Sequence, residues 1–216
     1  MALVIDKLIM GLTKMRNYNM AVLTEKQIKY GFDYYHKDDA RPKSVVEVSE
    51  YDGEDKLMIN CTQLEESYSA KAKKRIWMEW CDFLVNNPDT FTELMFCTRM
   101  PQELFDAVCA QRRLKRLHIK WGVYPDISKL ENLQELEYLH IGSGRSVSRL
   151  EPISRLVNLV ALSIENFQQI DDYAPLANLK HLESLALEGD FAAPKILKVQ
   201  SLEFLRHMKQ LRFLAF

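Results

Sequence analysis

The sequence is poor in glycine and lacks the short motifs that mark common catalytic sites. It contains seven glycines in 216 residues, which leaves little material for a glycine-rich loop around a nucleotide phosphate. No G-x-S-x-G, H-E-x-x-H or phosphate-loop pattern occurs. The triplet Gly142-Ser143-Gly144 follows an expected strand and is interpreted as a turn. We therefore expect a protein that is not an enzyme and that carries no cofactor.

The sequence also lacks a large net charge of either sign. The formal net charge is −1, from 29 Lys and Arg against 30 Asp and Glu. A chain without a net field is not steered toward nucleic acid or anionic lipid. The basic run at residues 71–75 is the best candidate for such a patch, but one helical turn of cations before an apolar stripe is more typical of a solvated face. We expect neither a nucleic-acid nor a membrane partner.

Long apolar runs and cysteine motifs are also missing. No stretch of about 18 apolar residues occurs, so no membrane span is predicted. Asp6 and Lys7 interrupt the apolar N-terminus, and no small-residue cleavage site follows, so it is interpreted as a helix and the expected location is cytoplasmic. In a reducing compartment, cysteines without a C-x-x-C pair are expected to be buried thiols. The four cysteines of this sequence are Cys61, Cys81, Cys97 and Cys109.

Residues 1–90 are predicted to form an α+β segment. Apolar spacing and a capping box indicate helices within residues 1–36. Strand-like residues 44–51 and 56–61 flank Asp52-Gly53, a dipeptide typical of β-hairpins. A long helix is expected from about residue 67 to 85. A solenoid exposes its first core layer unless a polar element covers it, so we interpret this segment as a cap.

Leucines recur at a nearly constant interval in the rest of the chain. Successive units are separated by 23, 22, 23, 23 and 29 residues, and each begins L-x-x-L-x-L or a close variant. This interval lies in the period of about 20–29 residues of leucine-rich repeats. The units begin at Phe91, Leu114, Leu136, Leu159, Leu182 and Leu211.

Residues 91–216 resemble leucine-rich repeats of the internalin-like class, most strongly at residues 175–189. The resemblance implies an α/β fold: a curved right-handed solenoid of about six repeats, with a parallel β-sheet on the concave face and short helices or 3₁₀ turns outside. The usual Asn after each strand is missing, and about six extra residues occur around residues 190–199. Turn geometry is therefore expected to vary, with a bulge at that insertion. The residues at the Asn positions are Gly122, Gly144, Phe167 and Asp190.

Alternate strand residues should point away from the core and align in columns across the sheet. Arg and Tyr occur in these columns and Trp121 is next to them in the sequence; all three residue types are enriched at binding hot spots. We predict a surface that binds a protein or peptide partner, although any solvent-facing strand must carry polar residues of some kind. The candidate partner-binding residues are Arg116, His118, Lys120, Trp121, Tyr138 and His140 on two adjacent strands, and Glu165 and Glu188 on the next two.

The columns place His118 and His140 one strand apart. Two histidines could share a metal ion, but zinc needs a third ligand, and only Ser163 and Glu165 are near in the pattern. We therefore predict no metal site. As an exposed pair, both histidines would become charged near pH 6 to 6.5 and could make partner binding pH-sensitive.

The chain ends at residues 211–216 in the middle of a strand pattern. An unpaired apolar strand at a sheet edge promotes association. Either the protein continues beyond residue 216, or this edge pairs with another molecule. The alternative function is therefore a structural or assembly role, as a homo-oligomer formed through this edge or the N-terminal cap.

Overall fold

The computed structural model describes residues 41–189 and 197–216. The helices predicted within residues 1–36, and most of the bulge predicted around residues 190–199, lie outside these ranges.

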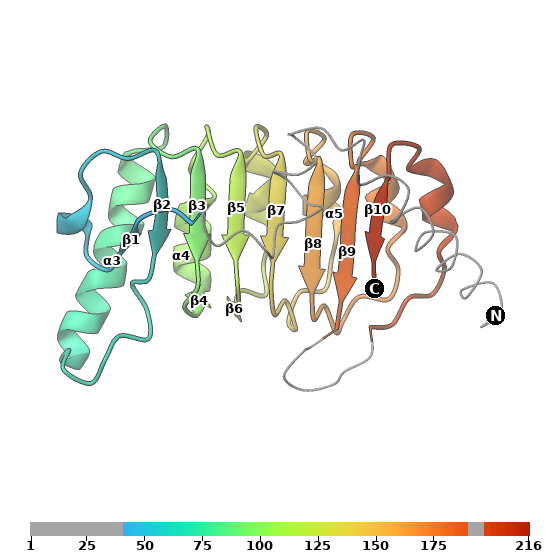
Figure 1. Cartoon of the computed structure of the whole chain (residues 1–216). Helices are drawn as coiled ribbons and strands as arrows, with labels where there is room; N and C mark the ends of the chain where they lie inside the picture. Colours follow the sequence, from blue (N-terminus) through green and yellow to red (C-terminus); the bar gives the residue numbers. More distant parts are fainter. Residues whose placement is uncertain (1–40, 190–196) are drawn as a thin grey trace.

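Parallel strands that follow one another in sequence order form the main sheet (Figure 1). Because every pairing is parallel, the chain must leave the sheet after each strand, cross behind it and return beside the strand it left. The described strands of this sheet are β1 (Ser44–Val45), β2 (Lys56–Ile59), β3 (Glu93–Phe96), β5 (Arg116–Ile119), β7 (Tyr138–Ile141), β8 (Ala161–Glu165), β9 (Ser184–Glu188) and β10 (Phe213–Ala215).

The return segments form an outer layer of helices behind the sheet (Figure 1). The first two are α-helices of 17 and 7 residues, and the later ones have four or five residues each and are 3₁₀ helices except for α5. The elements are α3 (Ala70–Asn86), α4 (Gln102–Val108), η6 (Ser128–Asn132), α5 (Glu151–Ser154), η7 (Ala174–Asn178) and η8 (Glu203–His207), besides the short turn η5 (Val48–Glu50). A small second sheet joins β4 (Met100–Pro101) to β6 (Gly122–Val123). No helix in the described ranges has the length and apolarity needed to cross a membrane.

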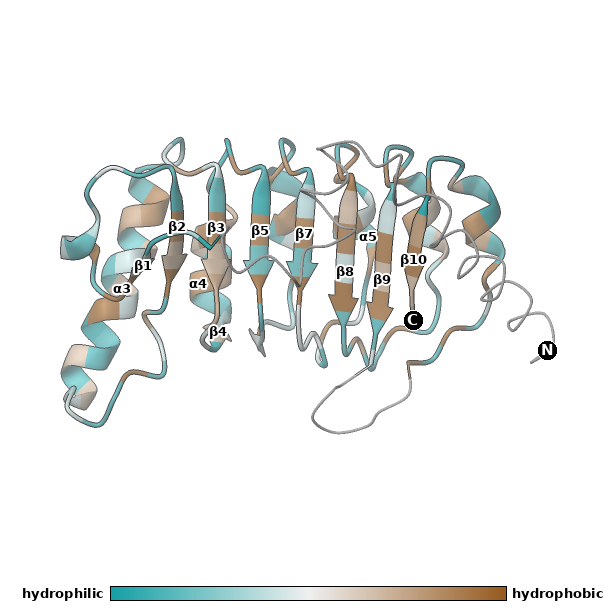
Figure 2. Ribbon diagram, in the orientation of Figure 1, coloured by the Kyte–Doolittle hydropathy of each residue, from teal (hydrophilic) through white to brown (hydrophobic). Residues whose placement is uncertain are grey.

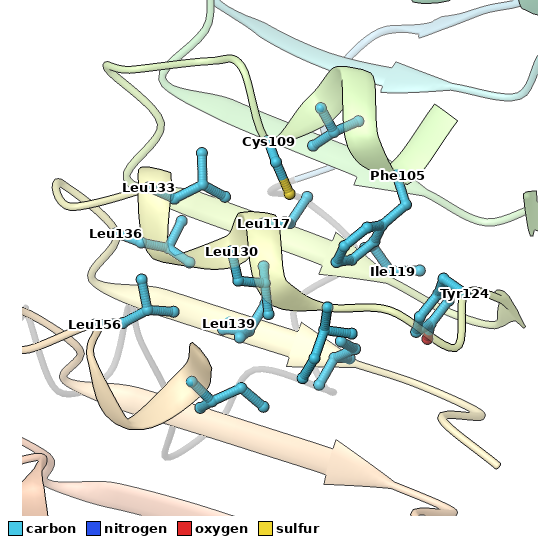
Figure 3. Close-up of a cluster of buried hydrophobic side chains, with 14 of the residues drawn as sticks. Phe105, Cys109, Leu117, Ile119, Tyr124, Leu130, Leu133, Leu136, Leu139 and Leu156 are labelled. Atoms are coloured by element: carbon cyan, nitrogen blue, oxygen red, sulfur yellow. The ribbon is translucent and has the colours of Figure 1, made fainter. Parts of the chain in front are cut away.

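The core lies between these two layers. Hydrophobic and hydrophilic residues alternate along β5 (Figure 2), and Leu117 and Ile119 are fully buried. Leu130 and Leu133 close the same core from the opposite layer (Figure 3). Since one repeat cannot bury both layers alone, the core forms only when neighbouring repeats stack. The predicted α/β leucine-rich repeat solenoid is confirmed.

The predicted hairpin is wrong. Strands β1 and β2 pair in parallel, with Ser44 opposite Met58 and Val45 opposite Ile59. Asp52-Gly53 does lie in a turn, where Gly53 has φ +107°. However, residues 46–55 are long enough to contain η5 and to return the chain to the start of the next strand. A hairpin signal is local, whereas strand direction depends on where the whole connection runs.

The sheet does not break at residue 90. β2 pairs with β3, with Lys56 opposite Glu93.

The predicted long helix is present as α3, where the Ser69 side chain caps the N-terminus by accepting a hydrogen bond from Ala72 N–H. Trp80 of α3 is fully buried, and its indole N–H donates to the Val46 carbonyl at 2.8 Å. The strands and helix of this segment therefore share the core of the repeats, and a capping role for residues 1–90 stays a prediction.

Gly142 is a position where the backbones of two repeats approach closely. A Cβ atom there would lie 1.9 Å from the Lys120 carbonyl oxygen, so Gly142→Ala must separate the ends of β5 and β7. We expect the free energy of unfolding to fall by about 2 kcal/mol or more, as measured by urea denaturation. The neighbouring Ser143 has φ 55°, a conformation that glycine adopts freely, so Ser143→Gly should be neutral or stabilising. Equal stability of Gly142→Ala and the natural protein would contradict this packing.

Candidate functional site on the concave face

The strand register aligns the residues that point away from the core into rows across the sheet. This confirms the alignment predicted from the sequence. The first row is Glu93, Arg116, Tyr138, Ala161 and Ser184, and the second row is Met95, His118, His140, Ser163 and Ala186. Beyond these rows, the strand-end group consists of Lys120, Trp121, Glu165 and Glu188, at the carboxyl ends of β5, β8 and β9.

Arg116 joins three strands of the first row. Its Nε lies 3.2 Å from Glu93 Oε1 on β3, and its Cζ lies 4.5 Å from the centre of the Tyr138 ring on β7. Only 9% of the Arg116 side chain and 14% of the Glu93 side chain are exposed. An ion pair and a cation–π contact at such low exposure are screened little by salt. The first row is thus held by charge as well as by backbone hydrogen bonds.

Two stacked histidines form the centre of the second row. The rings of His118 and His140 are 4.2 Å apart and nearly parallel, at 10°. The His140 Nδ1 lies 3.0 Å from Ser163 Oγ on the next strand. Burial holds the pKa of His118 well below 6.5, and the nearby His140 and Arg116 lower it further. Burial also lowers the pKa of His140 to about 4.

The histidine pair is therefore neutral at pH 7. The expectation that both would become charged near pH 6 to 6.5 is wrong, because these rings are removed from water and lie beside another ring that would carry the same charge. In the described part of the chain, no group of three or more His, Cys, Asp or Glu side chains is arranged to hold a metal ion.

Four of the eight candidate residues are buried, although the sequence predicted a solvent-facing surface. The exposed fractions are 8% for Arg116, 8% for His118, 2% for Tyr138 and 4% for His140. Side chains on adjacent strands stand close together, and these long ones cover each other sideways across the sheet. The rows form a packed polar layer. Their buried residues hold the neighbouring surface in place, but they expose little area that a partner could contact.

The strand-end group is more accessible. Lys120 is exposed, and Trp121, Glu165 and Glu188 are half-buried. The carboxylates Glu165 and Glu188 are direct neighbours in register, and partial burial raises the pKa of Glu188. Like charges in this arrangement repel, so a cationic group between them would be stabilised.

Two residues that support the concave face are not among the predicted candidates. Glu93 lies beside Arg116 in the register, and the ion pair between them was not predicted. Tyr124 stacks on Phe105 with ring centres 5.1 Å apart, and its hydroxyl donates to the Gly142 carbonyl. Burial raises the pKa of Tyr124 far above 10, so the hydroxyl stays protonated and keeps donating. The sequence signal for Tyr124 was an aromatic residue in the connection that follows β5.

The low pKa of His140 makes stability depend on pH. Below pH 6.5 the unfolded chain binds a proton at this residue, whereas the folded protein does so only near pH 4. The stabilisation is fully present above pH 6.5 and is lost as the pH falls toward 4. Between pH 7 and pH 5 the loss is about 2 kcal/mol.

Urea unfolding at pH 7 and pH 5 measures this dependence. His140→Gln should reduce the loss of stability between the two pH values, since it removes one titrating group. His181→Gln, which changes an exposed histidine, should leave the loss unchanged. An equal loss in the natural protein and in His140→Gln would contradict the burial of a neutral ring.

Comparison with known proteins gives matches among solved structures only. No protein-family model matches the sequence, and no curated protein matches it. Among solved structures, internalin C2 of Listeria monocytogenes str. 4b F2365 is similar, with a TM-score of 0.47 and 17% identity over 74% of this chain and 67% of that one. Internalin F of the same strain has a TM-score of 0.48 and 11% identity over 74% of this chain and 53% of that one. At these identities and TM-scores, the similarity assigns neither a family nor a role to this chain.

Proposed function

We propose that this protein is a non-enzymatic interaction module that binds a protein or peptide partner on the concave face of its repeats. The contact is made by the strand-end group, Lys120, Trp121, Glu165 and Glu188. The observation that carries the proposal is an accessible margin directly beside a packed polar layer, where Lys120 is exposed and Trp121, Glu165 and Glu188 are half-buried.

The first and second rows make this surface rigid. Arg116 is held between Glu93 and Tyr138, and His140 lies between His118 and Ser163. Side chains already fixed by their neighbours lose little freedom when a partner binds. The buried candidates therefore position the surface, and the strand-end group makes the contacts.

Charge along the surface indicates how a partner would lie. Lys120 follows β5, whereas Glu165 and Glu188 end β8 and β9. Three strand spacings of about 4.8 Å separate β5 from β9, a span of about 14 Å. An extended peptide of about four or five residues covers this distance. The partner segment that fits has an acidic group at the β5 end and a basic group at the β9 end.

The chemistry of the site supports binding more than catalysis. A general base must accept a proton near neutral pH, but burial lowers the pKa of His140 to about 4. Outside this site, a nucleophilic thiol would need a low pKa, but burial raises the pKa of both Cys61 and Cys81 to about 12. The four cysteines are free thiols.

A second candidate function is assembly through the last strand. In the described part of the chain, β10 is the terminal strand of the sheet and pairs in parallel with β9. Phe216, just beyond it, is 53% exposed. A terminal strand with an exposed aromatic residue can pair with a second molecule. The candidate would make the protein a homo-oligomer.

Substitution of the strand-end group tests the binding proposal. Immobilised protein is exposed to lysate of the source organism, and captured proteins are identified by mass spectrometry. The variant Lys120→Glu/Trp121→Ala should lose the partner that the natural protein captures, with affinity lowered about 30-fold or more as for a hot spot. Lys180→Glu, an exposed change on the turn after η7, is the control and should capture normally. Undiminished capture by the folded double variant would exclude this surface.

Light scattering over a range of concentrations tests the assembly candidate. If the β10 edge mediates association, the natural chain forms a stable oligomer and Phe216→Lys shifts it to monomer, because a charge at the edge opposes pairing. A protein that stays monomeric at high concentration, or an oligomer unaffected by Phe216→Lys, counts against assembly through this edge.

A further inference from the structure

A cavity of about 640 Å³ lies apart from the two rows of the concave face. Four segments surround it: the loop after β2, the first half of α3, the turn between β3 and α4, and Val123 of β6. Its volume is within the range of about 300–1,000 Å³ that is typical of small-molecule sites. None of its lining residues belongs to the strand-end group.

The cavity has apolar walls. Leu64 and the half-buried Trp77 line it, together with Pro101. Val123, which also lines the cavity, is 47% exposed. An apolar body that filled the cavity would remove these side chains from water, and burying an indole and two aliphatic groups favours binding.

Cations border the apolar walls. Lys73, Lys74 and Arg99 line the cavity, against a single acid, Glu103. Lys73 is held in place, since its Nζ donates to the Leu64 carbonyl at 2.8 Å. Lys74 and Arg99 are exposed, and their side chains have no hydrogen-bond or ion-pair partner among the residues that the structure describes. Two cations at an apolar cavity are therefore available to an anion.

The basic run at residues 71–75 is thus divided between two roles. Arg75 pairs with Glu79 at 2.8 Å and with Glu47 at 3.2 Å, so it belongs to the solvated face expected from the sequence. Lys73 and Lys74 instead line the cavity. Within one helical turn, Arg75 therefore faces its two acidic partners, whereas Lys73 and Lys74 face the cavity.

Hydrogen bonds between two loops fix one wall of the cavity. Thr62 Oγ1 donates to the Arg99 carbonyl at 2.6 Å and lies 2.8 Å from Thr98 Oγ1. Arg99 N–H donates to Gln63 Oε1 at 2.9 Å. Gln63 is held at φ 55°, a conformation that residues other than glycine rarely adopt. Such a fixed wall needs little reorganisation when a ligand binds.

We propose that this cavity is a binding site for a small anionic amphiphile, an aromatic or aliphatic body that carries one carboxylate or sulfonate. The body lies against Trp77, Leu64 and Val123, and the anionic group faces Lys74 and Arg99. Binding is non-covalent, because the Cys61 thiol in the lining is buried and has a raised pKa of about 12. The site is independent of a partner on the concave face.

Two fluorescent probes of similar shape and different charge test the site on the full chain. 8-Anilinonaphthalene-1-sulfonate is anionic, and N-phenyl-1-naphthylamine is its neutral relative. We expect the anionic probe to bind at one saturable site. Lys74→Glu/Arg99→Glu should weaken it about tenfold or more, because both changes oppose the sulfonate, while the affinity of the neutral probe stays within about twofold.

A matched control separates local from global charge. Lys71→Glu/Lys115→Glu changes the net charge by the same amount at exposed residues outside the cavity and should bind the anionic probe normally. Decanoate should displace the probe, and hexaglutamate should not. The proposal is overturned by the absence of saturable binding, by equal weakening in the control, by equal weakening of the neutral probe, or by displacement with hexaglutamate alone. Urea denaturation confirms that each variant is folded.

Discussion

The structure depends on stacking parallel strands so that leucines of successive repeats bury one another. Leu94, Leu117, Leu139 and Leu185 have no exposed surface, and each occupies the same register position in its strand. Alternation along a strand then forces the neighbouring residues to the opposite face. The core and the concave surface are therefore consequences of one pattern, and a shift by one residue in any strand would exchange them.

This constraint has a cost on the concave side. Long polar side chains are brought within one strand spacing of each other, and they must either pair or be neutral. Arg116 finds Glu93 and Tyr138, whereas His118 and His140 stay uncharged and stack. The result is a rigid polar layer whose accessible margin lies at the carboxyl ends of the strands, where Lys120 and Trp121 are found.

The solenoid changes character toward its N-terminal side. There the outer layer consists of full helices, since α3 spans Ala70–Asn86, while later repeats use 3₁₀ turns such as η7. The first half of α3 lines the cavity beside Trp77 together with residues between Arg99 and Glu103. The cavity therefore lies on this side of the stack, and its cations and the concave surface are separate features of the same molecule.

The sequence alone determined the repeat and the direction in which each strand side chain points. It also determined the alignment of Arg116 with Tyr138 and of His118 with His140. The reason is that leucine spacing is a local property, which is the same in any stacked arrangement of the repeats. It did not determine exposure, since burial of those four side chains depends on neighbours that lie more than twenty residues away in the chain. The parallel course of β1 and β2 was likewise decided by tertiary structure. A turn signal at Asp52-Gly53 bends the chain locally, but only packing of the connection against α3 settles which way the next strand runs.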